Sequence, residues 1–276
     1  MNFTIDEEKC IKCRACARDC PVLIIDAKTE YPEIKEGREA QCIRCQHCMA
    51  VCPTGALSIW GKNPEESVPV NDNIPGPEAM EQLIRTRRSI RRFSKEEIDK
   101  DLIEQLLKTA AHAPSSQNNN SVLFTLIDKR ENMAVLRSLA YDNILKASEE
   151  KRLPLRLAYM NKFQSMWQEK QVDIIFRYAP HLLIASAPKT VSCPEIDSCI
   201  ALSYFELLAN TNGIGTMWNG FAQWAIDKIG PEIRTALGIP EDHIIGGVLI
   251  FGKAAVKYKR SIQSDGLNLN RVSFPK

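Results

Sequence analysis

Hydrophobic residues divide the chain into two parts that differ in pattern. Before residue 61, apolar residues form only short runs, notably at positions 3–5 and 56–60, and these runs predict short strands. Pairing of the two segments would close a small module whose sequence looks internally duplicated. From residue 78 onward, helical spacing alternates with apolar runs of strand length, which predicts a second and larger domain.

The larger part begins with two predicted helices in series, near residue 78 and after Ser94. Ser94 and Glu97 form a capping-box pattern at the start of the second helix, and Asn212-Gly213 predicts the end of the last long helix. The remaining predictions are helices at 133–146, 155–169 and 196–209, and strands at 122–127, 182–185 and 248–251. Two helices in series favour a layered α+β domain over a simple doubly wound sheet.

Residues 61–77 separate the two parts. This stretch contains four prolines and Gly76 among asparagine and acidic residues. Such a composition breaks helices and strands alike. We therefore expect a first domain at residues 1–60, a linker at 61–77 and a second domain at 78–276.

Charge and composition argue against several classes of protein. The formal net charge is +2 and no run of five like charges occurs, so we expect no nucleic-acid-binding arm. No segment reaches the roughly 18 to 20 apolar residues that a membrane span requires. No apolar stretch separates Met1 from Cys10, so we expect no signal peptide and a cytoplasmic location.

Two copies of the motif Cys-x2-Cys-x2-Cys-x3-Cys-Pro occupy the first domain. Their cysteines are Cys10, Cys13, Cys16 and Cys20, and Cys42, Cys45, Cys48 and Cys52. This spacing is typical of ferredoxins with two [4Fe-4S] clusters. Zinc sites or a disulfide framework are the alternatives, but neither requires the third cysteine or the trailing Cys-Pro, twice. The first domain is therefore predicted to be a small ferredoxin-like 2[4Fe-4S] module.

In two-cluster ferredoxins the fourth cysteine of each run binds the other cluster. The predicted ligands are Cys10, Cys13, Cys16 and Cys52 for one cluster, and Cys42, Cys45, Cys48 and Cys20 for the second. A module this small buries little apolar surface, so we expect it not to fold without iron. Cys193 and Cys199 lie outside the runs, and ordinary reduced cysteines are favoured there over a redox-active pair.

Two polar segments stand out in the second domain. Residues 87–93 place four arginines around Ser89, and guanidinium groups beside a hydroxyl match the oxygens of a phosphate. Residues 113–120 form a Ser/Asn-rich turn whose donors suit the polar edge of a planar cofactor. Taken singly, each segment is better interpreted as solvated: a helix end and a polar loop.

Together and in this order, the segments resemble the flavin-dependent nitroreductase family. Its Arg-x-Ser-x-(Arg/Lys) motif is matched by Arg87, Arg88, Ser89 and Arg91, and its Pro-Ser-Ser-x-Asn motif by Pro114, Ser115, Ser116 and Asn118. Residues 213–220 resemble the segment that passes the flavin edge in the family, and the matching residues are Gly215, Thr216, Asn219 and Gly220. Arg260 follows Gly252 where the family supplies a late cation to the phosphate.

The resemblance implies a nitroreductase-like α+β sandwich, FMN bound by these residues, and an intertwined homodimer with FMN at the interface. After the second motif many relatives continue Gln-Pro-Trp, whereas this chain reads Asn119-Asn120-Ser121. That departure leaves the shape of the pocket near the turn open. Trp218 stands where a Gly-x-Gly-x-x-Gly fingerprint would end, so no dinucleotide fingerprint is present.

Electron counting connects the two domains. Iron–sulfur clusters pass single electrons, reduction of a nitro group takes two, and a flavin can accept electrons singly and deliver them in pairs. We therefore predict an FMN-dependent oxidoreductase that receives electrons through two [4Fe-4S] clusters and reduces a small organic acceptor such as a nitro compound. Reduced ferredoxin or NAD(P)H would be the external donor.

Alternative functions remain open on the sequence. Ene or quinone reduction uses the same flavin chemistry, and a redox sensor or electron carrier would turn over no substrate. The histidines suggest no acid–base site, so no catalytic acid is predicted. Tyr159, Phe163 and Trp167 lie near one face of a predicted helix, where a core role is favoured over contact with substrate.

Overall fold

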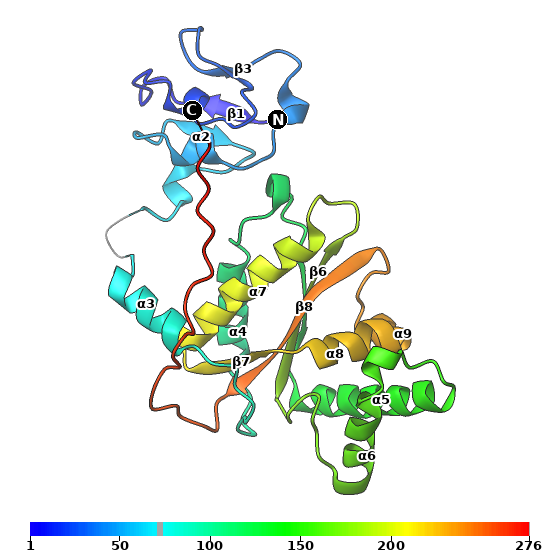
Figure 1. Cartoon of the computed structure of the whole chain (residues 1–276). Helices are drawn as coiled ribbons and strands as arrows, with labels where there is room; N and C mark the ends of the chain where they lie inside the picture. Colours follow the sequence, from blue (N-terminus) through cyan, green and yellow to red (C-terminus); the bar gives the residue numbers. More distant parts are fainter. Residues whose placement is uncertain (71–73, 276) are drawn as a thin grey trace. The chain divides into compact units, whose positions relative to one another are not determined.

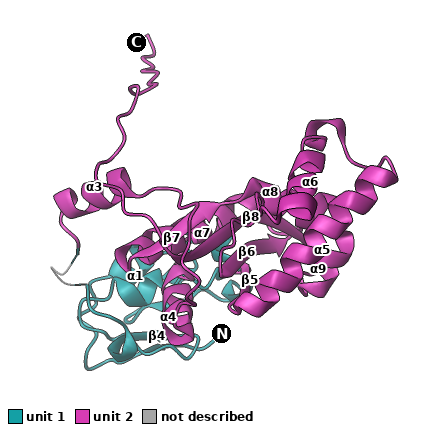
Figure 2. Ribbon diagram, turned by 90° about the horizontal axis from the view of Figure 1, so that it is seen from below, with its two compact units in different colours: residues 1–74, 117–119 teal, residues 75–116, 120–276 magenta. Residues whose placement is uncertain are grey.

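The computed structural model describes residues 1–70 and 74–275. It divides into two compact units, residues 1–74 with 117–119 and residues 75–116 with 120–276 (Figure 2). Residues 71–73, which fall within the predicted linker, lie outside the described part, as does Lys276. Within the predicted linker, Pro64–Glu66 forms a single turn of 3-10 helix, and the Asn63 side chain accepts a hydrogen bond from the Glu65 backbone N–H at its start.

The first unit closes as its hydrophobic pattern predicts. Strand β1 pairs antiparallel with β4, so that Phe3 faces Ile59 and Ile5 faces Leu57. A second pair, β2 with β3, forms a small hairpin. The elements are β1 (Phe3–Ile5), α1 (Ala15–Arg18), β2 (Ile25–Asp26), β3 (Glu33–Ile34), η1 (Glu39–Gln41), α2 (His47–Ala50), β4 (Leu57–Ile59) and η2 (Pro64–Glu66).

The two cysteine runs share a backbone conformation as well as a sequence. Arg14 before α1 and Gln46 before α2 both have left-handed backbones, with φ of 66° and 60°. Two residues earlier in each run, Lys12 and Arg44 both have φ of 55°. A left-handed backbone at a residue other than glycine costs about 1–2 kcal/mol. Each run therefore carries this conformational cost at matching positions between its cysteines.

The second unit is a mixed α+β domain. Its main elements are α3 (Pro77–Thr86), α4 (Lys100–Ala110), β5 (Leu123–Ile127), α5 (Arg130–Glu149), α6 (Met160–Lys170), β6 (His181–Pro188), α7 (Pro194–Thr211), β7 (Ile214–Trp218), α8 (Gly220–Trp224), the π-helix η5 (Ala225–Ile229), α9 (Pro231–Ala236) and β8 (His243–Lys253). Short 3-10 turns lie at η3 (Ser116–Asn118) and η4 (Leu155–Leu157). Helices α3, α7 and α9 each begin with proline, which suits the first helical position because its missing N–H would be unpaired there anyway.

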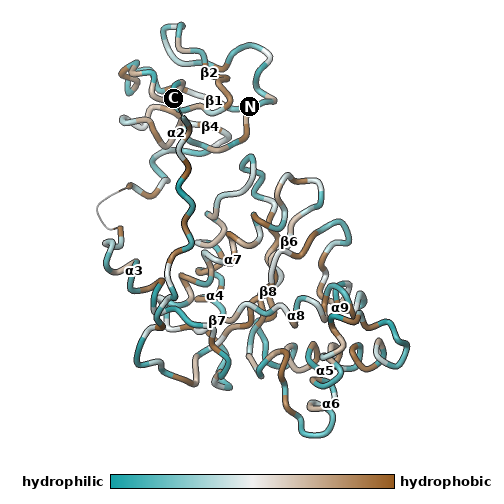
Figure 3. Tube along the Cα trace, viewed as in Figure 1, coloured by the Kyte–Doolittle hydropathy of each residue, from teal (hydrophilic) through white to brown (hydrophobic). Residues whose placement is uncertain are grey.

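A four-stranded antiparallel sheet in the order β5-β6-β8-β7 lies between two layers of helices (Figure 1). Alternate residues of the central strands face opposite sides. Leu183 of β6 and Leu249 of β8 pack with α4 and α7, whereas Leu182 and Val248 pack with α5, α6, α8 and α9. Hydrophobic residues accordingly run through the central strands (Figure 3). No helix of the described ranges, 1–70 and 74–275, is long and apolar enough to cross a membrane.

Three local predictions for this domain need correction. The predicted capping box is wrong, because α4 begins six residues after Ser94 and is capped by Asp99, whose carboxylate accepts from the Asp101 and Leu102 N–H groups. Residues 214–218 form strand β7, which is missing from the three predicted strands of this domain. The helix predicted from residue 155 begins at Met160, after the separate turn η4.

Candidate functional site

The structure gathers the eight motif cysteines into two groups of four. Cys10, Cys13, Cys16 and Cys52 line one cavity. In the other group, burial and, to a smaller extent, the neighbouring Cys45, Cys20 and Cys42 raise the pKa of the Cys48 thiol to about 12. Each group thus takes its fourth cysteine from the other run.

These groups fit a cluster better than a single ion. In the described part of the chain, no three His, Cys, Asp or Glu side chains are placed to share one metal ion. A [4Fe-4S] cube spaces its ligands more widely, because each thiolate binds its own iron. A buried thiol loses its proton less readily than a thiol in water. The positive charge of iron would stabilise the thiolate form that binds the cluster.

Hydrogen bonds to cysteine sulfurs differ between the two groups. The indole Nε1 of Trp60 donates to Cys42 Sγ at 3.4 Å, and the Arg44 guanidinium lies 4.3 Å from the Trp60 ring centre. In the other group, the backbone N–H of Ala56 donates to Cys52 Sγ at 3.3 Å. Hydrogen bonds to ligand sulfurs favour the reduced cluster, because reduction adds negative charge.

In the second unit, the arginine segment runs beside strand β7. Arg87 caps the end of α3. Ser89 and Thr216 then form an isolated parallel β-bridge, and the Ile90 N–H donates to the Thr216 carbonyl at 2.8 Å. The close approach requires glycine at position 215, because a Cβ there would lie 2.5 Å from Ile90 Cγ1. The structure therefore brings together two segments that the resemblance assigns to FMN, 87–91 and 215–216.

A buried carboxylate joins these segments to helix α7. Glu206 Oε1 accepts from Thr216 Oγ1 at 2.9 Å and from Arg87 Nη1 at 3.2 Å, and Oε2 accepts from Trp218 Nε1 at 3.1 Å. Glu206 is only 6% exposed. Sequence reasoning missed it, although a single acid between Phe205 and Leu207 in an apolar helix was a usable signal.

A second buried acid holds the Pro-Ser-Ser turn. The backbone N–H and the hydroxyl of Ser116 donate to the Asp197 carboxylate at 2.9 and 2.8 Å. Ser115 Oγ accepts from the Asn120 N–H at 2.9 Å. A cavity of about 90 Å³ adjoins the turn, lined by Pro114 and Ser115 among others. Asp197 was also missed by sequence reasoning, because it lies in the first turn of a helix where an acid has an ordinary explanation.

The tip of the same turn, residues 117–119, belongs to the first compact unit. There Asn118 Nδ2 donates to the Ile43 carbonyl at 3.0 Å. Gln117, Asn118 and Asn120 all have left-handed backbones, with φ of 52°, 55° and 48°. Asparagine tolerates this conformation better than most residues, which explains the composition of the turn.

The other predicted FMN residues occupy varied environments. Asn219 caps α8 by accepting the Ala222 N–H and donates to the Ile175 carbonyl, so its side chain is used within the protein. Gly220 begins α8. Arg88 is half-buried, whereas Arg91 and Arg260 are exposed, the last beyond the end of β8. The structure does not gather Arg260 with the arginine segment through any hydrogen bond or ion pair among the described residues.

The predicted aromatic stripe divides between core and surface. Trp167 stacks on the buried Tyr141 with ring centres 5.1 Å apart. Phe163 makes an edge contact with Phe221, and Tyr159, which is 39% exposed, makes edge contacts with both. Trp167 therefore has a packing role, and Tyr159 is the member of the stripe that solvent reaches most readily.

Comparison with protein families identifies both parts of the chain. The nitroreductase family matches residues 84–253, and a 4Fe-4S dicluster domain matches residues 9–56. The chain belongs to the nitroreductase family and carries an N-terminal 4Fe-4S dicluster domain. Comparison with curated proteins gave no significant match.

Solved structures share the fold of the second unit. A nitroreductase with bound FMN from Bacteroides fragilis is 20% identical and has a TM-score of 0.56, covering 69% of this chain and 97% of its own. One from Desulfitobacterium hafniense, also with bound FMN, is 19% identical with a TM-score of 0.53 and the same coverage of 69% and 97%. Iodotyrosine deiodinase bound to FMN and 3-iodo-L-tyrosine is 19% identical with a TM-score of 0.52, covering 71% and 100%. These likenesses confirm the predicted nitroreductase-like α+β fold.

Removing the buried carboxylate tests how far the segments depend on it. Glu206→Ala leaves the buried Thr216 hydroxyl and the Trp218 indole N–H without their acceptor, so we expect the free energy of unfolding to fall by about 3 kcal/mol. Denaturant unfolding followed by circular dichroism measures the change. As a control, Glu81→Ala breaks an exposed pair with Arg85 and should cost no more than about 0.5 kcal/mol. Equal effects of both variants would contradict the structural role of Glu206.

The indole of Trp60 offers a separate test on the first unit. Trp60→Phe keeps an aromatic ring but loses the N–H donated to Cys42, so we expect the potential of one cluster to become more negative by tens of millivolts. About 1 kcal/mol of differential stabilisation corresponds to roughly 40 mV for one electron. An anaerobic redox titration followed by electron paramagnetic resonance measures both clusters, and the second serves as an internal control. Unchanged potentials, or equal shifts in both, would contradict the assignment.

Proposed function

We propose that the chain is an FMN-dependent oxidoreductase that receives electrons through two [4Fe-4S] clusters and reduces a small organic acceptor such as a nitro compound. The observation that carries this proposal is the union, in one chain, of a 4Fe-4S dicluster domain and a nitroreductase domain. FMN supplies the exchange between one-electron and two-electron chemistry that such a union requires. FMN in the structures of similar fold supports the cofactor.

The residues that would hold each group follow from the motifs and their geometry. Two crossed sets of four cysteines would bind the clusters: Cys10, Cys13, Cys16 and Cys52, and Cys42, Cys45, Cys48 and Cys20. FMN would contact Arg87, Arg88, Ser89, Arg91, Pro114, Ser115, Ser116, Asn118, Gly215, Thr216, Asn219, Gly220 and Arg260. Thr216 and Asn219 use their side chains within the protein, and the Thr216 carbonyl and the Asn219 N–H are also bonded there.

The donor set of the arginine segment suits a phosphate. Glu206 binds Nη1 of Arg87, and among the described residues no other hydrogen bond or ion pair reaches this guanidinium, so its other nitrogens would form the paired hydrogen bonds that phosphate oxygens favour. The Ile90 side chain packs against the backbone at Gly215 and the Ile90 N–H donates to the Thr216 carbonyl, so strand β7 holds the arginine segment in place.

The identity of the acceptor is the finer part of the proposal. Iodotyrosine deiodinase has a similar fold and a substrate that is not a nitro compound, so the fold alone does not select among acceptors. Ene or quinone reduction therefore stays a second candidate. The external donor is proposed to be reduced ferredoxin or NAD(P)H, the assembly a homodimer and the location cytoplasmic.

Arginine substitution tests the proposed phosphate site. Arg87→Ala should weaken FMN binding tenfold or more, because a hydrogen bond to a charged group is worth about 1.5–3 kcal/mol. Equilibrium dialysis with free FMN measures the affinity. Arg85→Ala is the matched control, since Arg85 lies on the same helix and pairs with Glu81 at the surface. If Arg87→Ala binds FMN as tightly as the parent, the phosphate assignment is wrong.

Comparison of two chains tests the proposed route of electrons. The full chain is reconstituted anaerobically with iron, sulfide and FMN, and a second chain begins at Pro75, where the second unit starts. We expect the shorter chain to keep FMN and to be reduced chemically, but to lose turnover with reduced ferredoxin.

Steady-state rates are measured with reduced ferredoxin, NADH and NADPH against a nitro compound, a quinone and an activated alkene. FMN content of both chains is the control for folding. Equal ferredoxin-dependent turnover by the shorter chain would remove the clusters from the path, and turnover of none of the acceptors by the full chain would favour a sensor or carrier.

A further inference from the structure

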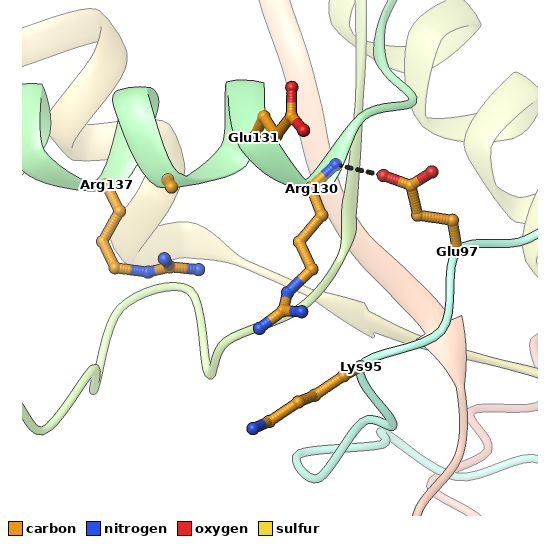
Figure 4. Close-up of a pocket in the computed structure, with 6 residues that line it drawn as sticks. Lys95, Glu97, Arg130, Glu131 and Arg137 are labelled. Carbon is orange, nitrogen blue, oxygen red and sulfur yellow. Dashed lines mark hydrogen bonds between the residues drawn. The ribbon is translucent and has the colours of Figure 1, made fainter.

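A groove of about 430 Å³ lies beside the beginning of helix α5 (Figure 4). Its lining residues are Lys95, Glu97, Arg130, Glu131, Ala134 and Arg137. None of them is a predicted FMN residue or a cluster ligand, and all belong to the second unit. The groove is therefore a separate feature, with a volume in the range of about 300–1,000 Å³ that small-molecule sites occupy.

Three cations face this groove. Arg130, Ala134 and Arg137 are four and three residues apart along α5, which places them on one face of the helix. Lys95 comes from the segment before α4. The side chains of Lys95, Arg130 and Arg137 extend to the same side of α5, whereas Glu131 extends from the opposite side of the helix (Figure 4).

The remaining carboxylate at the groove, that of Glu97, is already engaged. Its Oε1 accepts the backbone N–H of Arg130 at 2.7 Å (Figure 4). Its Oε2 lies 3.9 Å from Lys129 Nζ. The hydrogen bond from Arg130 N–H holds the pKa of Glu97 below its ordinary value. Within residues 1–70 and 74–275, no ion pair joins Lys95 or the Arg130 guanidinium to an acid, so their charges face solvent in the groove.

The third cation is fixed in place by a buried acid. Arg137 Nε donates to Asp173 Oδ2 at 2.7 Å, and the Asp173 side chain is fully buried. Asp173 also accepts from the Tyr141 hydroxyl and from the backbone N–H groups of Phe176 and Tyr178. The bond uses Nε, and the guanidinium also lies 5.3 Å from the Tyr178 ring centre. Within the described ranges no hydrogen bond to its two terminal nitrogens is present, so they would donate to a ligand from a preorganised position.

We propose that this groove binds a phosphate-bearing small molecule through Lys95, Arg130 and Arg137. Guanidinium groups match the oxygens of a phosphate in pairs, and the lysine adds a compact charge that tolerates several geometries. The phosphate comes either from inorganic phosphate or from a phosphomonoester whose organic part fills the rest of the groove.

Calorimetric titration of the full chain, loaded with FMN and clusters, tests the proposal. FMN loading fills the proposed flavin site, so that added phosphate cannot report on it. The probes are inorganic phosphate and adenosine monophosphate, at low ionic strength because salt screens such contacts. We expect saturable binding that the double variant Lys95→Gln, Arg130→Gln weakens at least tenfold. Tighter binding of the nucleotide indicates a phosphomonoester, and equal binding indicates free phosphate.

The matched control is the double variant Arg85→Gln, Lys108→Gln, which removes two exposed cations elsewhere in the same unit. It should bind both probes as the parent does, and both double variants should keep FMN and the parent unfolding profile. Arg137 is left unchanged, because its loss would strand the buried Asp173 charge. Absence of saturable binding, equal affinities for the groove variant and the parent, or an equal loss in the control would overturn the proposal. The proposal would also be overturned if the groove variant bound phosphate like the parent but lost turnover with reduced ferredoxin. That result would point to a protein partner.

Discussion

The carboxylate of Glu206 is the interaction on which the arrangement of the second unit's site segments depends. A carboxylate is costly to bury unless donors replace the water that it loses. Here the donors come from Arg87, Thr216 and Trp218, that is, from the end of α3 and from strand β7, and the acceptor comes from α7. One side chain thereby sets the position of two segments that are more than a hundred residues apart in the sequence.

Much of the fold was predictable because hydrophobic runs are local signals. The pairing of β1 with β4, the three apolar strands and the end of α7 were all predicted. Strand β7 was not, because Gly215 and Thr216 interrupt its apolar pattern, and its pairing with β8 is a tertiary property. The capping-box prediction was wrong because of another tertiary contact. Ser94 N–H pairs with the Lys253 carbonyl, which keeps the chain extended until Asp99 starts the helix.

The candidate site was predictable where function depends on residue type and spacing alone. The cysteine runs and the arginine and serine motifs have that property. Glu206 and Asp197 do not, since a buried acid is recognised only by the donors that surround it, and Arg87 for Glu206 and Ser116 for Asp197 are distant in sequence. The same limit applies to Thr216 and Asn219, whose motif positions gave no sign that their side chains already had partners within the protein.

The crossed grouping of cysteines also constrains how the first unit can be made. The cavity with Cys10, Cys13 and Cys16 is completed by Cys52, and the second group needs Cys20 from the first run. During synthesis, therefore, the second set of four thiols is complete only after the ribosome has released residue 48, and the first set only after it has released residue 52. Cofactor insertion is then a late step for both halves of the repeat at once, and a nascent chain bearing only the first run has no complete site to load.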